Sequence, residues 1–113
     1  DTSKVTEALV QQYFELTTRA GNRDALVKRF EQTVAGPLSL KVPDISQPTL
    51  IIWGRDDKLI PLKMGRRFAQ EIPNSRLVIL DNLGHIPHEE GPKISLDVAI
   101  EFINAPEQMV LAE

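Results

Sequence analysis

Two short apolar runs, separated by a helix-like segment, constrain this chain most. Residues 49–53 and 76–80 are apolar at nearly every position, and a glycine follows each run within four positions. Runs of this kind are typical of parallel strands that are buried on both faces. Between them, apolar residues recur at helical spacing from 64 to 72, flanked by Pro61 and Pro73. The order strand, helix, strand predicts two parallel strands joined by a right-handed crossover.

Two parallel strands are too few to make a stable sheet alone. Their apolar faces need helices above and below, and their edges carry backbone groups that need neighbouring strands. We therefore expect the sheet to be completed by a further N-terminal segment or by another copy of the chain.

Three more helices are predicted outside the strand pair. Apolar residues at spacings of three and four predict an amphipathic helix over 5–16, and a second helix follows Gly21, with Asn22 able to cap it. Pro92 opens a last helix. The apolar positions are Val5, Leu9, Tyr13 and Leu16 in the first helix, Ala25, Leu26 and Phe30 in the second, and Ile94, Val98 and Phe102 in the last.

A proline-rich stretch marks a boundary between the first two helices and the strands. Pro37, Pro43 and Pro48 fall within a dozen positions, which disfavours α-helix and favours an extended connector. The predicted domains are a helical segment over 1–40 and an α/β segment over 41–113. The predicted fold class is α/β, with a helical pair followed by β-α-β-α.

Charge and composition disfavour several classes of function. The net charge is -3, with 13 Lys and Arg mixed among 16 Asp and Glu, so no basic stripe is present for nucleic acid. There is no cysteine, hence no disulfide and no cysteine-ligated zinc. The longest apolar stretches, such as 50–53, are far shorter than the roughly 20 residues that span a bilayer. With no basic and apolar leader at the start either, we expect no membrane partner and, by default, a cytoplasmic location.

An aspartate and a histidine follow the two predicted strands. Asp57 stands three positions after Gly54, and His85 comes directly after Gly84. The carboxyl ends of parallel strands meet at one edge of a sheet, where α/β proteins gather their catalytic groups, so Asp57 and His85 are expected within hydrogen-bond reach. An aspartate bound to the imidazole Nδ1 fixes the tautomer and leaves Nε2 to deprotonate a nucleophile.

This joint pattern resembles the C-terminal part of the α/β-hydrolase family. It runs from Trp53-Gly54-Arg55-Asp56-Asp57 to Gly84-His85-Ile86-Pro87-His88-Glu89. In that family the chain order is nucleophile, acid, histidine. The resemblance therefore implies that Asp57 is the triad acid and His85 the base.

The resemblance covers Val42 to Ile103 well and has further implications. Residues 1–40 look like the last helices of the lid that covers the substrate in many relatives. Trp53-Gly54-Arg55-Asp56-Asp57 together with Leu59-Ile60-Pro61 is similar to the sequences of the branch that includes carbon-carbon bond hydrolases, esterases and lactonases. This implies a small-molecule substrate, and no cofactor or metal is expected.

The nucleophile is missing from the 113 residues. The family carries it in G-x-S-x-G, and none of the five serines here lies in that motif. The resemblance thus implies a C-terminal part that needs an N-terminal half or a second copy and is inactive alone. Some relatives use aspartate as nucleophile, so the missing residue stays open. The serines are Ser3, Ser39, Ser46, Ser75 and Ser95.

Structural explanations compete with the catalytic ones. Asp57 can be the N-cap of the helix near Pro61, and His85 an ordinary loop histidine bonded to a backbone carbonyl. Asp56, the less favoured acid, can cap a turn or pair with an adjacent basic side chain.

The acidic and histidine residues after His85 do not form a metal motif. Pro87 interrupts any H-E-x-x-H pattern, so His88, Glu89 and Glu90 are predicted to be solvated. A non-catalytic module that pairs through its sheet, with an inherited motif, is the alternative function.

Overall fold

The computed structural model describes residues 2–32 and 37–105. The chain divides into two compact units, Asp1–Ser39 and Leu40–Glu113, and each is described by itself. Within the described ranges, no helix is both long enough and apolar enough to cross a membrane.

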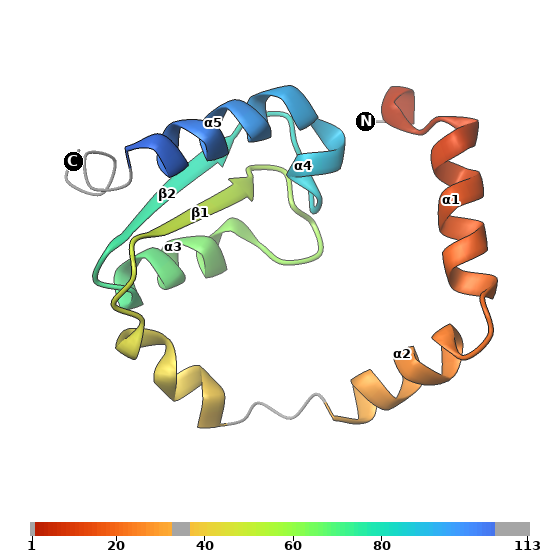
Figure 1. Cartoon of the computed structure of the whole chain (residues 1–113), viewed down its shortest axis with the longest axis horizontal. Coiled ribbons are helices and arrows are strands. Elements are labelled where there is room, and N and C mark those ends of the chain that lie inside the picture. Colours follow the sequence, from red (N-terminus) through yellow and green to blue (C-terminus); the bar gives the residue numbers. More distant parts are fainter. Residues whose placement is uncertain (1, 33–36, 106–113) are drawn as a thin grey trace. The chain divides into compact units, whose positions relative to one another are not determined.

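The N-terminal unit is helical, as the apolar spacing predicted. A 3₁₀ turn, η1 (Thr2–Lys4), precedes α1 (Glu7–Thr18), and α2 (Asn22–Glu31) follows (Figure 1). The hydroxyl of Thr6 accepts a hydrogen bond from the Leu9 N–H at 3.2 Å. This bond satisfies one of the backbone donors that the first turn of a helix leaves open, which explains why α1 begins here.

The joint between α1 and α2 depends on a glycine. Gly21, with φ 86°, occupies the N-cap of α2, and Asn22 is the first helical residue rather than the cap. The Asn22 side-chain amide instead donates to the carbonyl oxygen of Leu16 at 2.6 Å, tying α2 back to α1. No residue of α1 or α2 is buried. Their large exposed apolar side chains are Val10, Tyr13, Phe14, Leu16, Leu26, Val27 and Phe30.

The proline-rich stretch is not extended. Pro37–Asp44 forms a 3₁₀ helix, η2, with Pro43 inside it, so the prediction of an extended connector is wrong. Proline fixes φ near -65°, which lies within the 3₁₀ range, so the residues that disfavour an α-helix interior here are compatible with a 3₁₀ helix.

The C-terminal unit is built on two parallel strands. β1 (Thr49–Gly54) pairs with β2 (Ser75–Leu80), in register from Thr49 opposite Ser75 to the last residue of each strand. Because the register is level, both strands end at the same edge, and the loops that follow them start side by side. The predicted α/β order of a helical pair followed by β-α-β-α is confirmed.

Helices cover both sides of the strand pair. α3 (Leu62–Glu71) contacts both strands and lies on one side of them, while α5 (Pro92–Asn104) contacts β1 from the other side (Figure 1). A short helix that the sequence pattern did not predict, α4 (Pro87–Glu90), packs against α5 and β1. Pro87 at its first turn is compatible with helix because the N–H that proline lacks has no partner there anyway.

The core of this unit is small. Ile72, Leu80 and Leu83 are its buried apolar residues, and the rings of Trp53 and Phe68 meet with centroids 6.5 Å apart. The strand residues before the last position are only half-buried. Parallel strands with apolar residues on both faces are normally buried on both faces. In this unit the apolar strand residues are less buried than that. Along α5, the apolar side chains that remain exposed are Ile94, Leu96, Ile100 and Ile103.

Candidate active site

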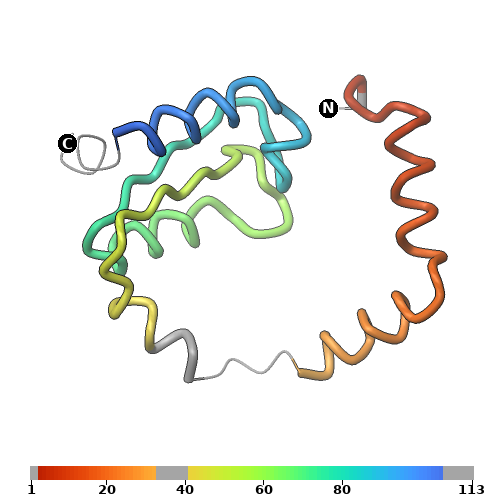
Figure 2. Tube along the Cα trace, in the orientation of Figure 1, coloured from red at the N-terminus to blue at the C-terminus, as the bar shows by residue number. Residues whose placement is uncertain are grey.

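The loops after β1 and β2 lie side by side at the carboxyl ends of the strands. Figure 2 shows residues 55–61 next to residues 81–87. Two backbone bonds of 2.9 Å join them: the Arg55 N–H donates to the carbonyl of Leu80, and the Asp56 N–H donates to that of Leu83. The sheet geometry therefore continues past the strands and fixes the two loops to each other.

Gly54 shows how closely the loops approach. A Cβ atom at this position would stand 2.1 Å from the carbonyl oxygen of Gly84 and 2.5 Å from that of Leu83. Both are backbone atoms in a hydrogen-bonded loop, so no side chain fits. The glycine after β1 is thus required by contact with the histidine-bearing loop.

The Asp57 carboxylate closes its own loop and also reaches His85. Its Oδ1 accepts the N–H groups of Leu59 and Ile60, both at 2.8 Å, and its Oδ2 lies 3.0 Å from His85 Nδ1. The side chain is 4% exposed. The N-cap of α3 is Pro61, without a side-chain bond, so the alternative reading of Asp57 as that cap is wrong.

The hydrogen bonds decide the charge of Asp57. Burial alone would raise its pKa, but the bonds from His85 and from the N–H groups of Ile60 and Leu59 outweigh burial and lower the pKa below its usual value of 3.8. The carboxylate is therefore ionised at neutral pH. An ionised carboxylate can only accept, so Nδ1 of His85 carries the proton in this bond.

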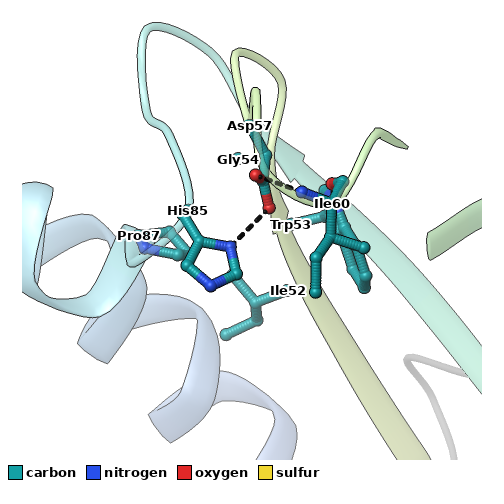
Figure 3. Close-up of a pocket in the computed structure, with 7 residues that line it drawn as sticks. All are labelled: Ile52, Trp53, Gly54, Asp57, Ile60, His85 and Pro87. Carbon is teal, nitrogen blue, oxygen red and sulfur yellow. Dashed lines mark hydrogen bonds and ion pairs between the residues drawn. The ribbon is translucent and has the colours of Figure 1, made fainter. Parts of the chain in front are cut away.

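His85 presents its second ring nitrogen away from Asp57. Figure 3 shows Nδ1 directed at the carboxylate and the second ring nitrogen on the side of the ring turned away from Asp57. The side chain is 42% exposed, and its Nε2 makes no hydrogen bond to any residue that the structure describes. In the tautomer set by Asp57, Nε2 is an unprotonated acceptor, which is the form required of a general base.

A shallow apolar pocket borders the pair. Its volume is about 200 Å³, below the roughly 300 Å³ of the smallest ordinary ligand sites. One wall is held in place by the indole N–H of Trp53, which donates to the carbonyl of Ile60 at 3.2 Å. The pocket thus accommodates a small apolar group next to His85. Its lining residues are Ile52, Trp53, Gly54, Asp57, Ile60, His85 and Pro87 (Figure 3).

Glu90 is part of this site, although it was predicted to be solvated. It is half-buried, and its carboxylate accepts the N–H of Gly84 at 2.9 Å and the N–H of Ile86 at 3.2 Å. The prediction failed because both partners are backbone N–H groups. Nearly every residue type carries such a group, so the sequence does not show which of them Glu90 binds. A glutamate in the first turn of a short helix opened by Pro87 is the signal that points to such a cap.

The other candidate residues lie outside the hydrogen-bonded pair. Asp56 is exposed, and its carboxylate makes no bond or ion pair within the described ranges. The neighbouring Arg55 pairs with Asp81 instead. His88 and Glu89 are exposed, and nowhere in residues 2–32 and 37–105 do three or more His, Cys, Asp or Glu side chains cluster as metal ligands would.

Comparisons with known proteins point to one family. The sequence pattern of the alpha/beta hydrolase fold matches residues 9–92. A 2-hydroxy-6-oxononadienedioate/2-hydroxy-6-oxononatrienedioate hydrolase of Cupriavidus pinatubonensis is 31% identical over 108 residues. That alignment covers 91% of this chain and 37% of the relative, so the chain spans little more than a third of the relative's length.

Two solved structures share the fold. A putative lipase from Acinetobacter baumannii superposes with a TM-score of 0.75 at 26% identity, over 92% of this chain and 37% of its own. A serine hydrolase involved in carbazole degradation superposes with a TM-score of 0.77 at 22% identity, over 88% of this chain and 40% of its own. The second likeness bears on the fold alone.

Proposed function

This chain belongs to the α/β-hydrolase fold family, and on that premise we propose that Asp57 and His85 are the acid and base of a hydrolytic triad. One observation carries the proposal: the 3.0 Å contact between Asp57 Oδ2 and His85 Nδ1, made by loops that follow two adjacent parallel strands. The nucleophile comes from outside these 113 residues, which contain no G-x-S-x-G.

The chemistry follows from the tautomer. His85 Nε2 takes the proton of the nucleophile as that group attacks a substrate carbonyl, and Asp57 stabilises the resulting imidazolium through Nδ1–H. The same proton then passes from Nε2 to the leaving group. In the second half of the reaction His85 deprotonates a water molecule, which releases the acyl group from the nucleophile.

The substrate class is a small carbonyl compound: an ester, a lactone, or a molecule cleaved at a carbon-carbon bond beside a carbonyl. The apolar lining beside His85 supports an uncharged group at the reacting centre. The relative from Cupriavidus pinatubonensis is a hydrolase of 2-hydroxy-6-oxononadienedioate, an oxo compound.

We further propose that the N-terminal half of the hydrolase, or a second copy, completes the sheet and the active site. The two-stranded sheet, the thin cover of its strands and the exposed apolar side chains of α5 all support a missing neighbour. In this proposal α1 and α2 are the last helices of a lid over the substrate. The chain alone is inactive.

The test is to assay p-nitrophenyl esters with the chain alone and with the chain assembled with the segment encoded upstream of it. Turnover is expected only in the assembly, lost in His85→Ala and retained in the control His88→Ala, whose side chain is exposed. Turnover by the chain alone that His85→Ala abolishes would contradict inactivity. An assembly whose turnover survives His85→Ala would contradict the triad.

A second candidate function is a non-catalytic module that pairs through its sheet. The exposed apolar side chains on α5, with Ile103 73% exposed, favour a protein partner of some kind. Light scattering separates the two: a stable dimer of the chain that gains no activity on assembly supports the pairing module, and a folded monomer removes it.

A further inference from the structure

The carboxylate of Glu90 binds the backbone N–H groups of the two residues that flank His85 in the sequence. Its Oε2 accepts the N–H of Gly84 at 2.9 Å, and its Oε1 accepts the N–H of Ile86 at 3.2 Å. In return, the Glu90 N–H donates to the carbonyl of Ile86 at 2.9 Å. Hydrogen bonds to a charged group are the stronger kind, so the histidine is fixed between two anchored neighbours.

The same carboxylate also sets the contact between the two catalytic loops. A Cβ at Gly84 would stand 2.9 Å from Glu90 Oε1 and would push on the carboxylate, and the Gly84 carbonyl is an atom against which Gly54 packs. Gly54 in turn begins the loop that carries Asp57. The N–H that Glu90 binds belongs to the Leu83–Gly84 peptide, and the Leu83 carbonyl of that peptide accepts the N–H of Asp56 at 2.9 Å. The bond from Glu90 therefore supports the contact between the histidine loop and the loop that carries Asp57.

The helix that carries Glu90 is itself tied to α5. Ser95, 5% exposed, donates from its hydroxyl to the carbonyl of Pro87 at 2.8 Å, and its N–H donates to the carbonyl of Gly91 at 3.0 Å. Glu90 is thus held by contacts to α5 as well as by its bonds to the loop.

From these contacts we infer that Glu90 is a positioning residue for His85. It keeps the imidazole in the geometry in which Nδ1–H faces Asp57 and Nε2 stays open. This inference names the residue that holds the proposed base in place. It rests on the proposed function only in that His85 must be the base for its position to matter in catalysis.

The experiment reads the hydrogen bonds directly, by NMR on the whole chain. Amide hydrogen exchange at Gly84 and Ile86 and the ¹⁵N shifts of the His85 ring are compared in Glu90→Ala, Glu90→Gln and the control Glu89→Ala. Glu89 is the exposed acid beside it on α4, so the control removes the same charge.

In Glu90→Ala we expect exchange at both amides to accelerate roughly tenfold to hundredfold, the ratio for a lost charge-assisted bond, and the single Nδ1–H tautomer to become a mixture. Glu90→Gln keeps one acceptor and is expected to protect one amide and to retain most of the tautomer. Glu89→Ala is expected to match the native chain.

Native exchange and a native tautomer in Glu90→Ala would overturn the inference. If that variant does not fold, Glu90→Gln decides. A folded Gln variant with one unprotected amide and a small loss of the single tautomer supports the role, and one with native exchange and a native tautomer overturns it. A Gln variant that also fails to fold assigns Glu90 to the fold and overturns it. None of these measurements uses activity. The role of Glu90 can therefore be contradicted without contradicting the triad, and the triad without contradicting the role of Glu90.

Discussion

Gly21 joins the two helices of the N-terminal unit and Gly54 ends the first strand of the C-terminal unit, yet an added methyl group would meet different surroundings at each. At Gly21 nothing lies within 4 Å, whereas at Gly54 two carbonyl oxygens of the opposite loop stand within 2.5 Å. At Gly21 only the positive φ favours glycine, because the space around it is empty. At Gly54 the opposite loop occupies the space that a side chain would need. The C-terminal unit thus fixes its candidate site internally, while the apolar faces of α1 and α2 stay exposed.

The largest expected effect is on catalysis in the closed unit. In the assembled enzyme, Asp57→Asn should lower kcat about 10⁴-fold, because the amide still accepts from Leu59 and Ile60 but donates to His85 and favours the wrong tautomer. Steady-state kinetics checks this, with Asp56→Asn as the matched control at near-native rate. Equal losses in the two variants would remove the distinction between the aspartates.

The two glycines allow the comparison itself to be broken. Gly54→Ala should destabilise the C-terminal unit by about 3 kcal/mol or more, since backbone of the opposite loop must move. Gly21→Ala should cost only about 1–2 kcal/mol, from its positive φ, and should affect the helical unit alone. Denaturant unfolding followed by NMR resolves both. Similar losses of unfolding free energy in the two variants would show that the loops after β1 and β2 can move apart to accommodate a side chain at position 54.

The two units also differ in how deeply their apolar side chains are buried, and this difference predicts a smaller effect on stability. Leu83 is 5% exposed and Phe30 69% exposed. Leu83→Ala should cost about 2–4 kcal/mol, whereas Phe30→Ala should cost less than about 0.5 kcal/mol in the chain alone. Calorimetry on the two variants measures this. A large cost for Phe30→Ala would mean that α2 is covered in solution, and that the N-terminal unit is less open than described.

The smallest effect concerns acid. Because the folded pKa of Asp57 lies below its usual 3.8, the bonds of its carboxylate add stability that is fully present above that value and is lost as the pH falls through the lowered one. Asp57→Asn should therefore weaken the native chain at neutral pH and differ from it less and less below about pH 4. Melting curves across this range test the sign. A difference that grows toward acid would contradict the lowered pKa.

The pair of Asp57 and His85 was predictable because strand ends obey a simple rule. Once residues 49–53 and 76–80 are assigned as parallel strands, the loops that follow them must meet at one edge of the sheet. An aspartate in one loop and a histidine in the other are then expected to form a hydrogen bond. The helices α1, α2, α3 and α5 were predictable from the spacing of their apolar residues.

Glu90, α4 and η2 were missed for a different reason. The role of Glu90 depends on two backbone N–H groups, and every residue type carries such groups. The prolines around η2 disfavour an α-helix but are compatible with a 3₁₀ run, and Pro87, predicted to end a loop, stands at a helix start that accepts proline. The 113 residues contain no G-x-S-x-G, so no pattern within them shows a nucleophile.

The position of Trp53 gives the chain a built-in optical reporter. It is the single tryptophan, it borders the pocket, and its ring lies against Gly65 and near Phe68, so its emission senses the strand-end region. The single tyrosine, Tyr13, lies on α1 in the other unit. Each unit therefore carries its own chromophore, and energy transfer from Tyr13 to Trp53 would report the approach of the helical unit without any label.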